Sequence, residues 1–216
     1  MKKIFYSTLS IALLAVSISS CGKSSKGKMA NDWKVTEMTS TSTDTQANGD
    51  KTVTTTSATE TSATTTTATT TGSSTNTTTT TASIAVNGMT IDKDGTWSWD
   101  QDFTIVNGVV TQNTKTTKTG TWSFVSKTKG DDFKKNERVV FNVLTDNSTV
   151  VTSVGSSSTT STSADTYLTG ENVMIYTIKD SKKDELKLER DGSNTSSAGS
   201  STSSYVSSEM ITLSAK

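Results

Sequence analysis

Apolar and polar residues alternate along much of the chain after residue 82. Between residues 96 and 106, large apolar side chains occupy nearly every second position, and Gln101 takes one place in the same series. The apolar members are Trp97, Trp99, Phe103 and Ile105. Successive side chains of a strand point to opposite faces, so this spacing predicts a strand with one buried and one solvated face.

Turn signals separate several segments of this kind. Asn87-Gly88 and Asn107-Gly108 each stand between apolar runs, and Asn-Gly favours a two-residue hairpin turn. Asp94-Gly95 and Asp191-Gly192 are turn signals of a related type. Because no segment after the N-terminal apolar run has helical periodicity, we expect an all-β chain. It is predicted to be an antiparallel up-and-down meander of about eight to ten strands. The segments predicted to lie in these strands are 31–38, 83–86, 89–91, 96–106, 109–110, 120–124, 138–144, 149–154, 172–179, 185–189 and 206–214.

Residues 39–81 form a segment of low complexity. From Thr52 to Thr81, 19 of 30 residues are Thr, and the segment has few apolar groups. Thr favours extended backbone, but such a segment buries too little apolar surface to offset the entropy lost on ordering. It therefore predicts a mobile or loosely extended insertion, with a regular Thr-faced β-ribbon as the alternative. Two further Ser/Thr-rich segments, 155–165 and 193–204, are predicted to be loops.

The N-terminus has the pattern of a secretory signal peptide. Lys2 and Lys3 precede an apolar run over 4–18, small residues follow, and the chain turns polar after Cys21. The run is shorter than the roughly twenty residues of a transmembrane helix. We therefore predict a signal peptide over 1–20, with a free cysteine in a transmembrane helix and a soluble secreted protein as alternatives.

Ile18-Ser19-Ser20-Cys21 resembles the lipobox of bacterial lipoproteins, in the relaxed form typical of the Bacteroidota. This resemblance implies that the Cys21 thiol and the new amine are acylated, and that residues 21–32 tether the protein to a membrane. Gly22 is not an acidic retention residue, and the tether is basic. We therefore expect an outer-membrane lipoprotein of the cell envelope that faces the periplasm.

A series of short motifs over 31–38 and 82–214 resembles the lipocalin-like domain of Bacteroidota lipoproteins. The motifs are Asn31-Asp32-Trp33, Ile91-Asp92-Lys93-Asp94-Gly95-Thr96-Trp97, Gly120-Thr121-Trp122, Tyr176-Thr177-Ile178 and Asp184-Glu185-Leu186-Lys187-Leu188. The family has Gly where this chain has Asn31, and it lacks the Thr-rich insertion. The resemblance implies one lipocalin-like barrel over residues 33–214, interrupted by the insertion at 39–81.

Composition excludes several classes of function. Signal removal would leave 19 basic and 21 acidic residues, a net charge of −2, which argues against a nucleic-acid partner. The chain has no His, which removes the common nucleophile–base systems and the commonest metal ligand. Asp100 and Asp102 share a strand face but are predicted to face solvent. We therefore expect no enzyme, no cofactor and no metal site.

The aromatic cluster is the remaining candidate site. An eight-stranded barrel can hold one small ligand, so these side chains are candidates for the wall of an apolar pocket. Gln101 is the polar group on that face that could orient the ligand. The alternative is a filled barrel that acts in a structural or protein-interaction role without a ligand. The candidate residues are Trp97, Trp99, Gln101, Phe103, Trp122 and Phe124.

Overall fold

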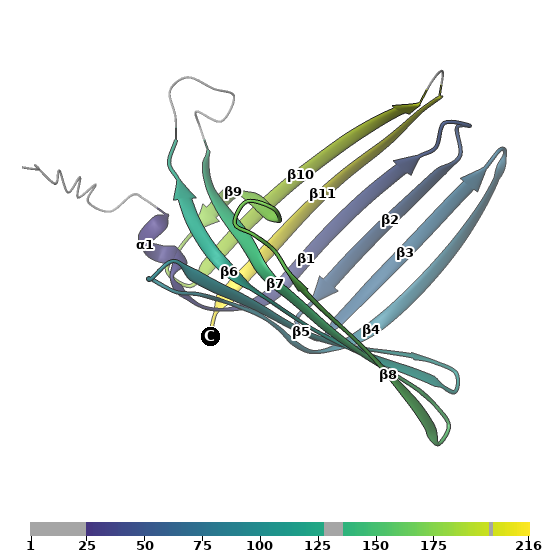
Figure 1. Cartoon of the computed structure of the whole chain (residues 1–216), viewed down its shortest axis with the longest axis horizontal. Coiled ribbons are helices and arrows are strands. Elements are labelled where there is room, and N and C mark those ends of the chain that lie inside the picture. The colour runs from purple at the N-terminus through teal and green to yellow at the C-terminus, as the bar shows by residue number, and fades with distance from the viewer. Residues whose placement is uncertain (1–24, 128–135, 199–200) are drawn as a thin grey trace, which may run out of the picture.

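The computed structural model describes residues 25–127, 136–198 and 201–216. The predicted signal peptide and Cys21 lie outside these residues. The elements are α1 (Lys26–Met29), β1 (Asn31–Thr45), β2 (Lys51–Thr59), β3 (Ser62–Thr71), β4 (Ser74–Ile91), β5 (Thr96–Asn107), β6 (Val110–Val125), β7 (Glu137–Val154), β8 (Ser157–Thr166), β9 (Val173–Ser181), β10 (Glu185–Ala198) and β11 (Ser201–Ala215) (Figure 1).

The strands form one antiparallel sheet that closes on itself. Its order is β6-β5-β4-β3-β2-β1-β11-β10-β9-β7-β8, and the additional β6–β7 pairing completes a ring of ten strands with β8 as one extra strand. Strands that follow one another in the sequence are mostly neighbours in the sheet. The prediction of an all-β, up-and-down meander that closes into a barrel is therefore confirmed.

Fewer strands form the barrel wall at its base than in the full ring of ten, so the barrel is narrower there. The first residues of β1 pair directly with the end of β4, from Asn31 opposite Ile91 to Lys34 opposite Gly88. The β2–β3 hairpin therefore does not reach the base, where eight strands close the wall. This end of the molecule holds the apolar core.

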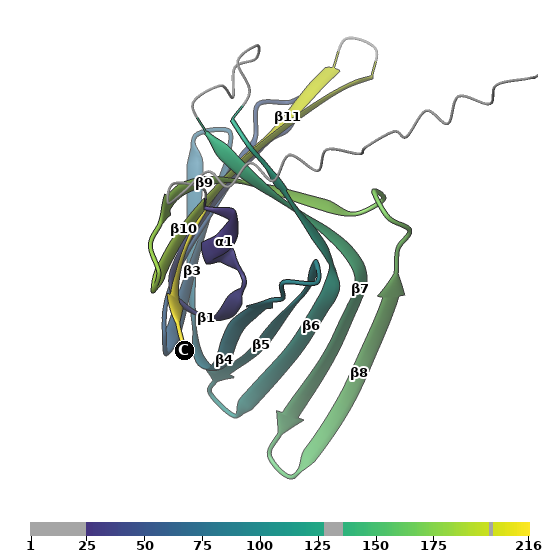
Figure 2. The same ribbon diagram turned by 90° about the vertical axis from the view of Figure 1, so that its left-hand side faces the viewer.

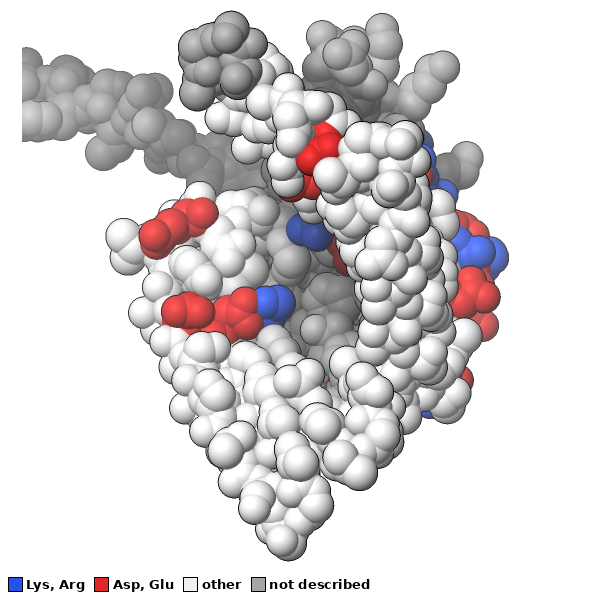
Figure 3. Space-filling view, turned by 90° about the vertical axis from the view of Figure 1, so that its right-hand side faces the viewer, with Lys and Arg blue, Asp and Glu red and all other residues white. Residues whose placement is uncertain are grey.

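Above the base the wall divides into two projecting sheets (Figures 1 and 2). The six-stranded arm consists of residues 190–198, 201–209, 37–45, 51–59, 62–71 and 74–83, in that spatial order. The four-stranded arm consists of residues 105–107, 110–119, 145–154 and 157–166. Figure 3 looks into the opening between the arms and shows a hollow between two walls.

Irregular pairings mark the level at which the arms leave the barrel. The register shifts between Val35 and Glu37 in β1, between Ile84 and Val86 in β4, and beside Gly120 in the β6–β7 pair. An extra residue in one strand bends that strand and increases its twist. These shifts therefore fit the change of direction from barrel wall to arm.

The Ser/Thr-rich segments are strands, which corrects the prediction of loose insertions and loops. Residues 39–81 lie in β1 to β4, residues 157–165 lie in β8, and residues 193–204 lie largely in β10 and β11. Thr side chains bond across the strands, as in the Thr56–Thr65 pair at 3.0 Å. Backbone hydrogen bonds between strands and these cross-strand side-chain contacts stabilise the Thr-rich strands, which bury little apolar surface.

Two of the predicted turns are also wrong. Asn87-Gly88 lies inside β4, and Asp191-Gly192 lies inside β10. The other two predictions mark hairpins: Gly95 has a φ of 94° after β4, and Gly108 has a φ of 58° between β5 and β6. The turn that the sequence favours is overridden because one continuous strand pairs with both flanking runs, β5 at Asn87-Gly88 and β11 at Asp191-Gly192.

The core fills the base of the barrel. Its fully buried side chains include Trp33, Phe141, Tyr176, Leu188 and Leu213. The short helix α1 lies at this end, where Met29 is buried and its carbonyl accepts a 2.8 Å hydrogen bond from Trp33 Nε1 (Figure 2). Within the described ranges, no helix has the length and apolar character needed to cross a membrane.

Candidate functional site

Trp97 and Trp99 belong to the packed core. Their exposed fractions are 2% and 5%, and the Trp97 ring lies 5.0 Å from that of Phe141. Both indole N–H groups are used within the protein: Trp97 Nε1 donates to the Asn142 carbonyl at 3.1 Å and Trp99 Nε1 donates to Asn87 Oδ1 at 2.8 Å. Neither indole N–H is left for a ligand.

The other predicted site residues lie around this core. Trp122 and Phe124 are partly buried and pack against it, and Phe103 is half-buried beside Ile84 in the sheet register. Gln101 Nε2 approaches Asn87 Oδ1 at 3.5 Å. The structure therefore places Gln101, Trp99 and Asn87 together, and Asn87 is the residue that the sequence interpretation missed.

A pocket opens in the barrel wall where β1 and β4 separate. Direct β1–β4 pairing ends at Lys34 opposite Gly88, while β3–β4 pairing begins only at Ser62 opposite Ser83. The β2–β3 turn, which carries Glu60 and Thr61, reaches across the gap. The space left between the strands is about 380 Å³.

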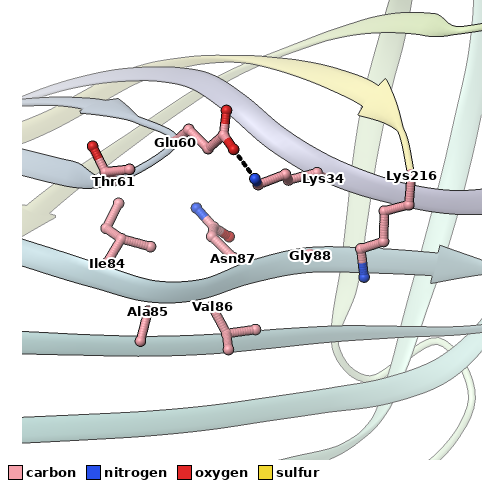
Figure 4. A pocket seen from close by; sticks show the side chains of 9 residues that line it. All are labelled: Lys34, Glu60, Thr61, Ile84, Ala85, Val86, Asn87, Gly88 and Lys216. Carbon is pink, nitrogen blue, oxygen red and sulfur yellow. Dashed lines mark ion pairs between the residues drawn. The ribbon is translucent and has the colours of Figure 1, made fainter.

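We call this space the wall pocket (Figure 4). One side is apolar, and the opposite side carries charged groups from β1, the β2–β3 turn and the C-terminal residue. Gly88 sits close to Lys216 Nζ, because a Cβ at this glycine would lie 3.0 Å from that nitrogen. The lining residues are Lys34, Glu60, Thr61, Ile84, Ala85, Val86, Asn87, Gly88 and Lys216.

Asn87 is the only polar lining residue that is buried, with 6% of its surface exposed. Trp99 Nε1 can only donate, so the Asn87 atom it meets must be the carbonyl oxygen. The amide nitrogen consequently points the other way, and Nδ2 has no hydrogen-bond partner among the described residues. A buried donor without an acceptor costs about 1–3 kcal/mol, which a ligand acceptor or an ordered water would recover.

The charged side chains that line the wall pocket are two lysines and one glutamate. Lys34 forms an ion pair with Glu60, and both side chains are about half exposed. No ion pair of Lys216 is present within the described part of the chain. Lys216 Nζ lies beside Gly88, next to Asn87, and therefore favours an anionic or neutral group near Asn87 over a cationic one.

Tyr176, a core residue, carries a second polar group of interest. The hydroxyl of Tyr176 donates to Glu209 Oε2 at 2.9 Å, and Arg190 both pairs with Glu209 at 2.8 Å and lies 5.2 Å from the Tyr176 ring centre. Burial raises the pKa of Tyr176 above its ordinary value, and the Glu209 carboxylate raises it further. These three groups satisfy one another, so they serve the stability of the barrel.

Of the acidic residues considered in the sequence, Asp94 and Asp100 are exposed, whereas the Asp102 side chain is partly buried, which corrects the prediction that it faces solvent. Asp100 accepts from Thr117 at 2.8 Å, and Asp102 pairs with Lys115 at 3.3 Å. Asp94 accepts two hydrogen bonds from Thr96, which lower the pKa of the Asp94 carboxyl. In the residues that the structure describes, no three acidic or metal-binding side chains form a cluster that could hold a metal ion.

The sequence around Asn87 contains a recognisable signal, but this signal predicts a turn and not a binding residue. Asn-Gly between apolar runs predicts a turn, and a turn residue is expected at the surface. Both Asn87 and Gly88 are instead buried strand residues.

Comparisons of the chain with protein-family models, with curated proteins and with solved structures found no match.

Proposed function

We propose that this protein is a lipid-anchored envelope lipoprotein whose barrel binds a small molecule in the wall pocket, without catalysing a reaction. The observation that carries the binding part is the buried amide of Asn87, which offers an unused donor toward a pocket that is apolar on one side. The anchoring part rests on the N-terminal pattern that ends at Cys21.

The anchor would hold the base of the barrel close to the membrane. Ser25 is buried and donates to Glu137, so the described chain is fixed to the barrel from this residue onward. Four residue steps separate Cys21 from Ser25, a span of at most about 14 Å. With α1 at the base, the two arms would project away from the membrane, into the periplasm for an outer-membrane lipoprotein (Figure 1).

The pocket defines the class of ligand. Ile84, Ala85 and Val86 suit an apolar body, and Asn87 Nδ2 requires a hydrogen-bond acceptor. Lys216 favours a negative charge on that acceptor. The proposed ligand is therefore a small amphipathic carboxylate, bound at the wall rather than among the core tryptophans.

A titration with three probes of equal chain length tests this assignment. We expect purified protein to bind octanoate more tightly than octanol, and octanol more tightly than octylammonium, in isothermal titration calorimetry. Asn87→Asp keeps an acceptor for Trp99 but removes the N–H donors, so it should abolish octanoate binding while the protein stays folded. Equal affinity for all three probes, or unchanged octanoate binding by Asn87→Asp, would contradict the proposal.

The anchor is tested separately. Metabolic labelling with a palmitate analogue should mark the wild-type protein in the membrane fraction, and Cys21→Ser should be unlabelled. Labelling that persists in Cys21→Ser would remove the assignment of this residue.

A further inference from the structure

The six-stranded arm ends in an unpaired strand edge. The first half of β4 pairs with β3 from Ser74 to Ser83, whereas β5 pairs with β4 only from Ala82 onward. Among the described residues, 74–81 therefore have a strand on one side only. Figure 1 shows this half of β4 at the outer side of the arm, apart from the four-stranded arm.

The backbone groups that face this edge can be identified. Ile84 N donates to Thr61 O at 2.8 Å, so Ile84 is hydrogen-bonded to the β3 side. In an antiparallel pair the residues that bond to a given neighbour alternate along the strand. The odd-numbered residues of this half therefore direct their N–H and C=O groups to the open edge. They are Thr75, Thr77, Thr79 and Thr81.

This edge has none of the features that usually block pairing. Natural edge strands are protected by charged side chains, Pro or bulges. Residues 74–81 contain no charge and no Pro, and the bulge of β4 lies further along, between Ile84 and Val86. Six of the eight residues are Thr, which favours extended backbone.

The same chain shows which kind of strand this edge accepts. β2, β3 and the first half of β4 are Thr-rich strands that pair antiparallel with each other. Side-chain hydrogen bonds join them, including Thr66–Thr79 at 3.3 Å and Thr70–Thr75 at 3.0 Å. A strand with the composition of β4 is therefore a fitting partner for β4 itself.

We infer that two copies of this chain associate through the β4 edge, antiparallel and about a twofold axis at Thr78. This register places Thr75 opposite Thr81 and Thr77 opposite Thr79 of the other copy, and it makes up to about eight backbone hydrogen bonds. The two six-stranded arms would then form one continuous sheet. The pairing leaves the wall pocket open, so it is independent of the proposed ligand.

Cysteine cross-linking tests the pairing. At the twofold axis the two Thr78 residues form a non-hydrogen-bonded pair, whose Cα separation of about 4.5 Å permits a disulfide. Full-length Thr78→Cys protein should therefore form a disulfide-linked dimer under mild oxidation, seen on a non-reducing gel. Thr55→Cys, an exposed position on β2, which is paired on both sides, is the matched control and should remain monomeric, as should the wild-type chain.

A second substitution distinguishes edge pairing from random collision. Thr79→Lys puts a charge on the edge and should reduce cross-linking of the Thr78→Cys chain several-fold, whereas Thr66→Lys, in the interior strand β3, should not. Far-ultraviolet circular dichroism shows that each variant retains its strands. Failure of folded Thr78→Cys to cross-link, equal cross-linking by Thr55→Cys, or indifference to Thr79→Lys would each overturn the inference.

Discussion

Trp99 fixes the orientation of Asn87. The indole Nε1 donates to Asn87 Oδ1 at 2.8 Å, and this bond leaves the amide nitrogen of Asn87 without a partner beside the wall pocket. Trp99 is predicted from the sequence to line a ligand site. In the structure it lies in the core and affects the wall pocket only through its hydrogen bond to Asn87. Trp99 is a positioning residue for Asn87, and Asn87 is the residue we expect to contact the ligand.

Removing the acceptor of Trp99 should destabilise the barrel. Asn87→Leu has a similar volume but leaves the buried indole N–H unsatisfied, which costs about 1–3 kcal/mol. We expect the urea midpoint to fall, whereas Asn87→Asp, which retains an acceptor, should unfold closer to wild type. An Asn87→Leu protein as stable as wild type would show that the Trp99–Asn87 bond contributes little.

Glu60 should weaken binding of anionic ligands by pairing with Lys34. Glu60→Gln frees Lys34 and raises the positive charge of the wall pocket, at a stability cost of at most about 1 kcal/mol for an exposed pair. The octanoate Kd should therefore fall a few-fold at low salt, and the gain should shrink at high salt because exposed charges are screened. Asp44→Asn, an exposed site on β1 outside the pocket, is the control and should leave the Kd unchanged.

Gly120 is required by the close approach of β6 and β7. A Cβ at this position would lie 1.8 Å from the carbonyl oxygen of Asn142 and 3.0 Å from Trp97 Nε1, the two groups that form a hydrogen bond. Gly120→Ala should therefore destabilise the protein by about 3 kcal/mol or more, measured by urea unfolding. Gly27→Ala, where no atom lies within 4 Å, should be close to neutral.

Tyr176 should make the protein sensitive to alkali. Its pKa in the folded state lies above the ordinary value of 10.0, so the unfolded chain loses this proton first as pH rises. The stability from Tyr176 is thus complete below pH 10 and declines above it by up to about 1.4 kcal/mol per pH unit. Tyr176→Phe should show a shallower loss of stability between about pH 8 and about pH 11. An identical pH profile for the two proteins would contradict this account.

The barrel could be predicted from the sequence because its base follows simple burial rules. Trp97 and Trp99 stand at alternate positions and both are buried, while Asp100, the residue after Trp99, is exposed. Large aromatic side chains at alternate positions of a strand, with polar residues between them, indicate one buried face. The aromatic face and the antiparallel order therefore followed from the residues alone.

The arms and the wall pocket could not be predicted in this way. The Thr-rich strands are ordered by pairing with neighbours, and a register such as Thr65 opposite Thr56 leaves no apolar pattern in the sequence. The wall pocket depends on where direct β1–β4 pairing stops, at Lys34 and Gly88, which is a property of three strands together. Asn87 therefore has the sequence pattern of a turn residue, although it is a buried strand residue.

The most direct test is the nuclear magnetic resonance signal of the Asn87 side-chain amide, assigned by its absence in Asn87→Asp. Titration with octanoate should shift this signal and the Trp99 indole signal together. The reason is that Trp99 Nε1 donates to the oxygen of the same Asn87 amide whose nitrogen would bind octanoate. The Trp97 indole signal, bonded to the Asn142 carbonyl, should move much less. An Asn87 amide signal that stays in place while octanoate binds elsewhere, or no binding at all, would contradict the account.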